Sequence, residues 1–250
     1  MGFRKKRLLT ATIALIAVVI LTSAYALSRL PNSEPSQTEA TLFQVSAYYP
    51  MSLGDYEGTL TYAELESHGD FGIGAFNGMD GEMVALDDSF YQVRTDGVPR
   101  VVDPSLKSPF AMLTFFSVDQ TVHMVDALNY SQLTVYIDSI LPSQNGVYAI
   151  KVHGNFEYAK ARSVPVQSKP YPALAEVVKN QTVFPLSNVL GTAVGYRCPS
   201  YMNGTDVPGY HLHFLTDSRD AGGHLLDCIV RNATIEIAYI DNFEMALSVG

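Results

Sequence analysis

The chain has 250 residues, of which 47% are hydrophobic and 16% are charged, and its formal net charge is −9. This length fits one large domain or two small ones, and the apolar content is ample for a core. The acidic balance argues against a nucleic-acid partner, because neutralising phosphates requires a basic surface. Lys and Arg cluster at the N-terminus only.

The first 27 residues are expected to direct export. A basic stretch at residues 4–7 precedes an apolar run over residues 8–27, as in a signal peptide or membrane anchor. Ala24-Tyr25-Ala26 offers a small-x-small cleavage site, and the run is also long enough to span a bilayer of ~30 Å. Cleavage and anchoring both stay open. Either way, the protein is expected to be secreted or membrane-anchored facing outside, with membrane contact through this segment alone.

The segment over residues 28–40 is rich in Ser, Pro, Asn, Glu, Gln and Thr and predicts a flexible linker. The rest of the chain, residues 41–250, is expected to be the functional domain. Most of it consists of short runs rich in β-branched and aromatic residues, separated by Gly, Pro, Asp and Asn. Strands are predicted at residues 82–86, 90–94, 111–116, 146–152 and 234–240.

Helices are predicted in fewer places. Residues 61–66 form a short candidate, in which Thr61 caps the helix and Glu64 is its capping-box partner. Residues 129–141 have helical apolar spacing, and residues 172–180 suggest another short helix. Mixed strands and scattered helices predict an α+β fold, with mixed, mostly antiparallel β-sheets in two similar β-rich halves.

Two further sequence features depend on the compartment. Cys198 and Cys228 are either paired in a disulfide, as an oxidising compartment would allow, or are both buried small apolar residues. Glycosylation sequons begin at four asparagines, which an exported protein could use. These are Asn129, Asn180, Asn203 and Asn232.

Half of the six histidines fall within fourteen positions. His211 and His213 lie two apart in an apolar stretch that predicts a strand, so they point to the same face. The polar, Gly-rich residues 216–223 predict a hairpin loop that returns His224 beside the pair. Three imidazoles with a fourth position open are what a catalytic zinc ion needs. A structural role for the His-x-His pair is the alternative.

Two other side chains are candidates for chemistry. Glu82 lies between a tight turn and an apolar strand, where an inward-pointing carboxyl would have a raised pKa. Arg162 presents a planar fork suited to a carboxylate. Taken alone, each is better explained as a surface residue.

Six stretches together make the chain recognisable. The sequence resembles the α-acetolactate decarboxylase family from about residue 41 to residue 240. The matching stretches are HGDFGIG (68–74), FNGMDGEM (76–83), FYQVR (90–94), KARSVP (160–165), PGYHLHFL (208–215) and GGHLLD (222–227).

The resemblance implies a carboxy-lyase that converts 2-acetolactate to acetoin and carbon dioxide through a metal-stabilised enediolate. It implies that His211, His213 and His224 bind Zn²⁺, that Glu82 is the active-site glutamate involved in proton delivery, and that Arg162 is the active-site arginine. A zinc ion that serves as the electron sink makes a thiamine or pyridoxal cofactor unnecessary. The partner expected is the small-molecule substrate, and a homodimer is permitted.

The sequence departs from the family at two places. Ala75 stands where the family often has Thr, which would remove one substrate hydrogen bond worth ~0.5–1.5 kcal/mol. Family members also carry a second active-site glutamate on a C-terminal tail, and Glu244 is the last carboxylate here. Two alternatives therefore stand beside the decarboxylase: a zinc hydrolase on the same histidines, and a non-catalytic metal-binding module that lacks the tail.

Overall fold

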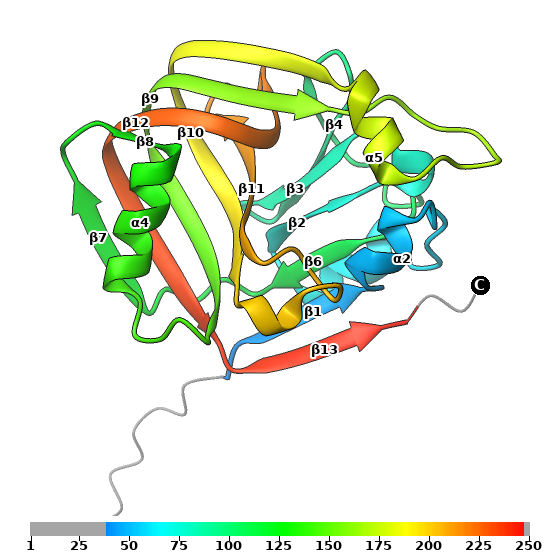
Figure 1. Cartoon of the computed structure of the whole chain (residues 1–250), viewed down its shortest axis with the longest axis horizontal. Helices are drawn as coiled ribbons and strands as arrows, with labels where there is room; N and C mark the ends of the chain where they lie inside the picture. The colour runs from blue at the N-terminus through cyan, green and yellow to red at the C-terminus, as the bar shows by residue number, and fades with distance from the viewer. Residues whose placement is uncertain (1–38, 248–250) are drawn as a thin grey trace, which may run out of the picture. The chain divides into compact units, whose positions relative to one another are not determined.

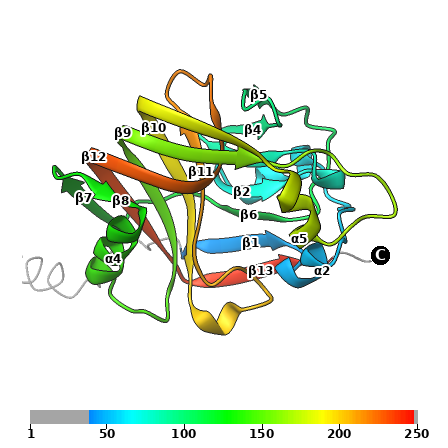
Figure 2. The ribbon, with the colours of Figure 1, turned by 45° about the horizontal axis from the view of Figure 1, so that its top comes forward.

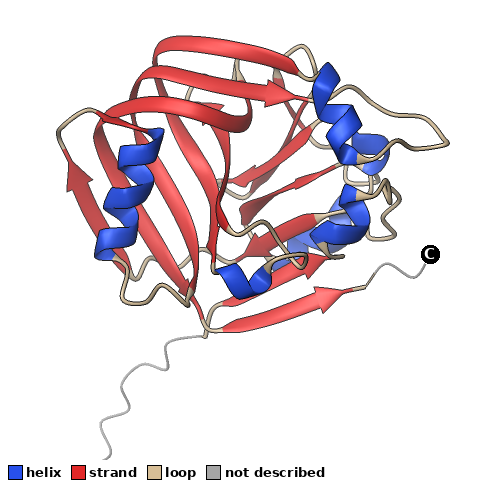
Figure 3. Cartoon of the chain, in the orientation of Figure 1, coloured by secondary structure: helices blue, strands red, loops and turns tan. Residues whose placement is uncertain are grey.

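The structure, a computed structural model, describes residues 39–247. The expected signal or anchor segment and nearly all of the expected linker lie outside the described residues. Two β-sheets form most of the described chain, and short helices lie at their margins (Figures 1 and 3). The predicted α+β class with mixed, mostly antiparallel sheets is confirmed. Within residues 39–247, no helix is both long enough and apolar enough to cross a membrane.

The first sheet, here called the short-strand sheet, has seven strands of three to five residues in the order β13-β1-β6-β2-β3-β4-β5. Its outermost pair, β13 and β1, is parallel, and its other pairs are antiparallel (Figure 2). The strands are β1 (Thr41–Val45), β2 (Phe71–Ala75), β3 (Glu82–Leu86), β4 (Ser89–Val93), β5 (Pro99–Val101), β6 (Ala111–Thr114) and β13 (Asn242–Ala246).

The second sheet, here called the long-strand sheet, contains strands of up to 19 residues. Its order is β11-β10-β9-β12-β7, and the short β8 also pairs with β12. Strand β11 pairs with both β10 and β12, so part of this sheet closes on itself. The strands are β7 (Gln120–Met124), β8 (Leu128–Asn129), β9 (Val147–Ser163), β10 (Thr182–Cys198), β11 (Gly209–Thr216) and β12 (Gly222–Ile240).

The helices are short, and two of them begin with a capping box. The predicted helix near Thr61 is α3 (Tyr62–Leu65), and its capping box is present. The second predicted helix is α4 (Tyr130–Ile140), capped by Asn129. The third is divided into α5 (Leu174–Val177) and a 3₁₀ turn over Val178–Asn180. The remaining elements are α2 (Tyr48–Ser52) and 3₁₀ turns at Glu66–His68, Asn77–Met79 and Ser200–Met202.

One apolar core joins the two sheets. Phe71 and Ile73 of the short-strand sheet pack in the same buried cluster as Val194 and Tyr196 of the long-strand sheet. A separate cluster lies under α4, where Leu133 and Ile137 are fully buried against the long-strand sheet. The face between the sheets therefore comes from elements far apart in sequence, and the candidate site lies there.

The two cysteines are not bridged. Cys198 and Cys228 are both buried and free, which agrees with their interpretation as buried small apolar residues and not as a disulfide. The thiol of Cys198 donates a hydrogen bond to the buried Asp206 carboxylate, 3.2 Å away. The asparagines of the four sequons are all exposed, and their use stays a prediction.

Candidate metal centre and active site

Three histidines converge on one face of the long-strand sheet. His211 and His213 lie on β11 with the predicted alternation, and the hairpin returns β12 so that His224 pairs in register with His213. The ring centroids are 5.1–5.3 Å apart. One ring nitrogen from each residue lies within 4.8 Å of the other two. This group can bind a metal ion.

The donor atoms fit a metal ion. His213 Nδ1 lies 2.7 Å from the carbonyl oxygen of Met83 and donates to it, which leaves the Nε2 lone pair free. That Nε2 atom is buried and has no hydrogen-bond partner among residues 39–247. His211 and His224 each have a buried Nδ1 without a partner as well. Buried polar atoms are normally satisfied, so three unpaired imidazole nitrogens in one place indicate a ligand.

The surroundings keep these rings neutral. Burial lowers the pKa of His211 to about 4, and the positive charge of Arg162 acts in the same direction. Burial also lowers the pKa values of His213 and His224 well below the ordinary histidine value. Neutral imidazoles are the form that binds metal ions, so at neutral pH the three rings need not lose a proton before they bind one.

Glu82 reaches the centre from the opposite sheet. It begins β3 directly after a tight turn in which Gly81 has φ +95°, and a Cβ at Gly81 would lie 2.4 Å from the carbonyl oxygen of Val93. Position 81 therefore requires glycine, and the Glu82 residue that follows it is 4% exposed. Glu82 Oε2 lies 3.5 Å from His213 Nε2. The residues alone favoured an exposed turn position for Glu82, whereas the family resemblance implied an active-site position, and the structure buries it.

Arg162 pairs with that carboxyl. Arg162 lies near the end of β9, opposite His224 in the ladder, and its Nη1 donates to Glu82 Oε1 at 2.5 Å. Burial raises the pKa of Glu82 above its ordinary value, and the Arg162 guanidinium partly opposes this rise. The pair thus holds a carboxyl that accepts a proton more readily than a solvated glutamate does.

All five predicted residues line one small inner cavity of about 40 Å³. Its other walls are apolar, and sequence reasoning identified Ala75 alone among them. The additional lining residues are Met51, Gly74, Met79, Phe110 and Leu174. Met79 lies within one of the matching stretches and could have been found there, whereas Met51 and Leu174 lie outside all of them.

The inner cavity continues into a wider outer cavity of about 570 Å³. Arg162, Leu174, His211 and His224 line both, and α2 and α5 form much of the outer wall. Glu244, in contrast, is exposed on β13 opposite Phe43 and lines neither cavity.

A buried carboxyl–guanidinium pair beside three neutral imidazoles, at the end of an access cavity, defines an enzyme with a candidate metal centre. Comparisons with known proteins identify which enzyme family this is. A family model described as alpha-acetolactate decarboxylase matches residues 42–249.

Relatives and a solved structure agree with that match. The alpha-acetolactate decarboxylase of Methanosarcina mazei is 48% identical over 209 residues, covering 83% of this chain and 73% of the relative. That of Bacillus subtilis is 39% identical, covering 87% and 86%. The crystal structure of acetolactate decarboxylase from Bacillus subtilis subspecies spizizenii superposes with a TM-score of 0.82 at 39% identity, covering 84% and 90%. The chain belongs to the α-acetolactate decarboxylase family, and it is a carboxy-lyase.

Proposed function

We propose that this protein decarboxylates 2-acetolactate to acetoin and carbon dioxide, with Zn²⁺ held by His211, His213 and His224. Family membership supports the reaction. The observation that carries the proposal is the junction of three unpaired neutral imidazoles with the Glu82–Arg162 pair in one cavity.

Zinc suits this donor set, because catalytic zinc sites commonly use three neutral protein ligands and keep one position open. When bound, the ion would stabilise the negative charge that develops on the substrate oxygens as carbon dioxide leaves. The unpaired Nε2 of His213, fixed by the hydrogen bond to Met83, supports its assignment as a ligand.

Arg162 binds and orients the substrate carboxylate before it is lost. Its guanidinium is nearly buried, with 11% of the side chain exposed, and it lines both cavities. A planar fork with several N–H donors can hold Glu82 on one side and a substrate carboxylate on another. Positioning the carboxylate in this way contributes by aligning the breaking bond.

Glu82 delivers the proton that replaces the carboxylate. A glutamic acid with a raised pKa is protonated more fully near neutral pH than an exposed one, so it is a better donor. Because Glu82 approaches the centre from the short-strand sheet alone, it adds the proton to one face of the substrate carbon. The product is then a single acetoin enantiomer.

The apolar walls exclude water and contact the substrate's methyl groups. The inner cavity holds only one or two water molecules, so a five-carbon acid must extend past Leu174 into the outer cavity. Ala75 presents a methyl group to the inner cavity, so no hydroxyl is available at that position for a substrate hydrogen bond.

One assay of the full chain separates this function from the alternatives. Bound metal is measured together with acetoin and carbon dioxide from racemic 2-acetolactate, and with hydrolysis of small esters. The expected result is bound zinc and acetoin formation that a chelator abolishes. Ester turnover without carbon dioxide would identify a hydrolase, and bound metal without either activity would identify a binding module. Both outcomes contradict the proposal.

We also propose that residues 1–27 direct export, so that the enzyme acts outside the cytoplasm as a secreted or membrane-anchored protein. The basic segment followed by an apolar run supports this proposal. Fractionation of cells that express the full chain, with N-terminal sequencing of the exported product, distinguishes cleavage from anchoring. Protein found entirely in the cytoplasm would contradict export.

A further inference from the structure

His211 lies where β11 has strand pairing on one side. Residues 209–216 all pair with β10, whereas only His213, Phe214 and Leu215 also pair with β12. His213 is further fixed by its hydrogen bond to Met83, and His224 pairs with Arg162 on one side and His213 on the other. His211 has neither support, so another contact must fix the start of β11 for its ring to hold a constant position.

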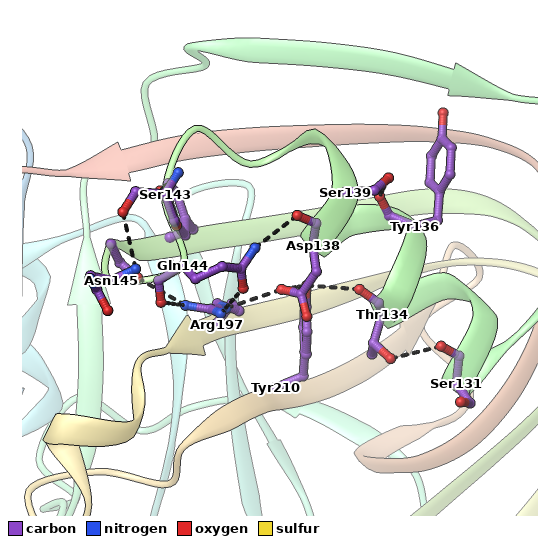
Figure 4. Close-up of polar contacts among 12 residues, drawn as sticks. Ser131, Thr134, Tyr136, Asp138, Ser139, Ser143, Gln144, Asn145, Arg197 and Tyr210 are labelled. Carbon is purple, nitrogen blue, oxygen red and sulfur yellow. Dashed lines mark hydrogen bonds and ion pairs between the residues drawn. The ribbon is translucent and has the colours of Figure 1, made fainter.

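The residue before it supplies such a contact. Tyr210 Oη lies 3.0 Å from Asp138 Oδ1 and 3.2 Å from the carbonyl oxygen of Thr134, both on α4 (Figure 4). The same carboxylate oxygen accepts a hydrogen bond from Arg197 Nε at 3.2 Å. Arg197 and Tyr210 are register partners on β10 and β11. Asp138 therefore bridges two adjacent strands to one helix, at the end of β11 that pairs with β10 alone.

The helix that carries Asp138 is firmly fixed. It begins with a complete capping box, and Leu133 and Ile137 are fully buried beneath it. At its other end, Arg197 Nη1 donates to the carbonyl oxygen of Gln144 at 2.6 Å, and Arg197 also bonds the Gln144 side chain (Figure 4). Arg197 is itself only 8% exposed. A strand end attached to such a helix has few alternative positions.

We propose that Tyr210 is a positioning residue for the metal centre: through Asp138 it fixes the end of β11 and so sets the position of the His211 ring. This inference rests on the proposed metal site. Partners that orient a metal ligand commonly contribute 10- to 100-fold to affinity. Tyr210 acts one residue away along the backbone, which places its expected effect at the lower end, about tenfold.

Tyr210→Phe tests the proposal, since it removes the hydroxyl and keeps the ring. Zinc affinity of the metal-free full chain is measured by competition with a chromophoric chelator. Tyr148→Phe is the matched control, because Tyr148 Oη bonds the backbone of Ser143 beyond α4, and Tyr148 lies on β9, far along the ladder from Arg162. We expect about tenfold weaker binding for Tyr210→Phe and a change of less than about twofold for Tyr148→Phe, on a strand end that holds no ligand.

A second readout separates positioning from general loosening. Co²⁺ bound in place of zinc reports ligand geometry through its visible absorption, and we expect its bands to shift in Tyr210→Phe and to stay unchanged in Tyr148→Phe. The double variant Tyr210→Phe with Asp138→Asn should lose less zinc affinity than the sum of the two single losses. Both substitutions remove the same hydrogen bond, between Tyr210 and Asp138. Tyr210 also lines the outer cavity, so its substitution can change turnover through substrate binding. The test of the positioning role is therefore metal binding, not turnover.

The outcomes keep the two proposals apart. If the unaltered chain binds no metal, the proposed metal function fails. If the unaltered chain binds zinc and Tyr210→Phe binds it equally well with an unchanged Co²⁺ spectrum, only the positioning role is overturned. Equal weakening by both Tyr→Phe changes also overturns it, since the effect would then be a general loss of stability.

Discussion

The long-strand and short-strand sheets place side chains in the site by different means. The long-strand sheet supplies His211, His213, His224 and Arg162 from strands whose ladders fix their spacing. The short-strand sheet supplies Glu82 from a five-residue strand, and contacts with the other sheet hold that glutamate in place. The proposed metal ligands therefore belong to one sheet, whereas the proposed proton donor reaches them only when the two sheets dock. Four substitutions test this division.

The largest effect is expected for His213→Ala, which removes one donor from the long-strand sheet. Bound zinc and acetoin formation should be lost together, with activity reduced more than about 1,000-fold, since losing one charge-stabilising group already costs ~100- to 1,000-fold. Metal content and acetoin are measured on the same sample. His123→Ala, an exposed histidine on β7, is the control. Normal turnover in His213→Ala would rule out the zinc assignment.

Glu82→Gln changes only the contribution of the short-strand sheet. It keeps an acceptor for Arg162 and removes the acidic proton, so activity should fall about 100- to 10,000-fold. Zinc content should equal that of the unaltered chain, which separates this variant from His213→Ala. Exposed Glu66→Gln serves as control. Loss of metal from Glu82→Gln would contradict the proposal that metal binding depends on the long-strand sheet alone.

Asp206 lies in the loop that joins β10 to β11, where the two sheets meet. The carbonyl oxygen of the neighbouring Thr205 accepts a hydrogen bond from Gln44 of β1 at 2.7 Å. Burial raises the pKa of Asp206 from 3.8 to about 6. A folded-state pKa above the unfolded value gives stability that is fully present below about pH 4 and is lost as the pH rises through 6. The difference corresponds to about 3 kcal/mol.

Asp206→Asn should remove this pH dependence. Between pH 4 and pH 7.5, the free energy of unfolding of the unaltered chain should fall by about 3 kcal/mol more than that of the variant. Urea unfolding at both pH values provides the measurement, and exposed Asp88→Asn should leave the difference unchanged. A parallel pH profile for Asp206→Asn and the unaltered chain would show that Asp206 titrates normally.

The smallest effect is expected for a single hydrogen bond between the sheets. Ser163 Oγ donates to the carbonyl oxygen of Val93 on β4 at 2.8 Å, next to Arg162. Ser163→Ala should lower the free energy of unfolding by about 1–3 kcal/mol, because a buried carbonyl loses a donor. Metal affinity should stay the same. Exposed Ser139→Ala should change stability by less than about 0.5 kcal/mol.

The sequence predicted best those features that depend on local periodicity. Alternation along β11 and the Gly-rich turn placed His224 beside His213, the capping box placed α3, and helical apolar spacing placed α4. The lengths of two long strands were underestimated: the run predicted at residues 146–152 extends to Ser163, and the run predicted at residues 234–240 begins at Gly222. The extension of β9 bears small and polar residues, and the pairing of β9 with two neighbours keeps it extended.

Long-range features lay beyond reach of the periodic pattern. The hydrogen bond from His213 to Met83 joins residues 130 positions apart, and a backbone carbonyl carries no mark in sequence. The apolar wall at Met51 and Leu174 comes from two short helices that only tertiary packing brings together. The resemblance to the family named the five polar residues, but it did not reveal which sheet each one comes from.

Consecutive residues of β3 serve both halves of the centre: Glu82 offers its carboxyl, and Met83 offers the carbonyl that orients His213. A small displacement of β3 would carry the acid and the support of the imidazole together. One dipeptide of β3 thus contacts the His213 ring twice, through the Met83 carbonyl and the Glu82 carboxyl. The proposed proton delivery and the orientation of one proposed metal ligand therefore depend on the same short strand, so a change in how the two sheets dock would affect both at once.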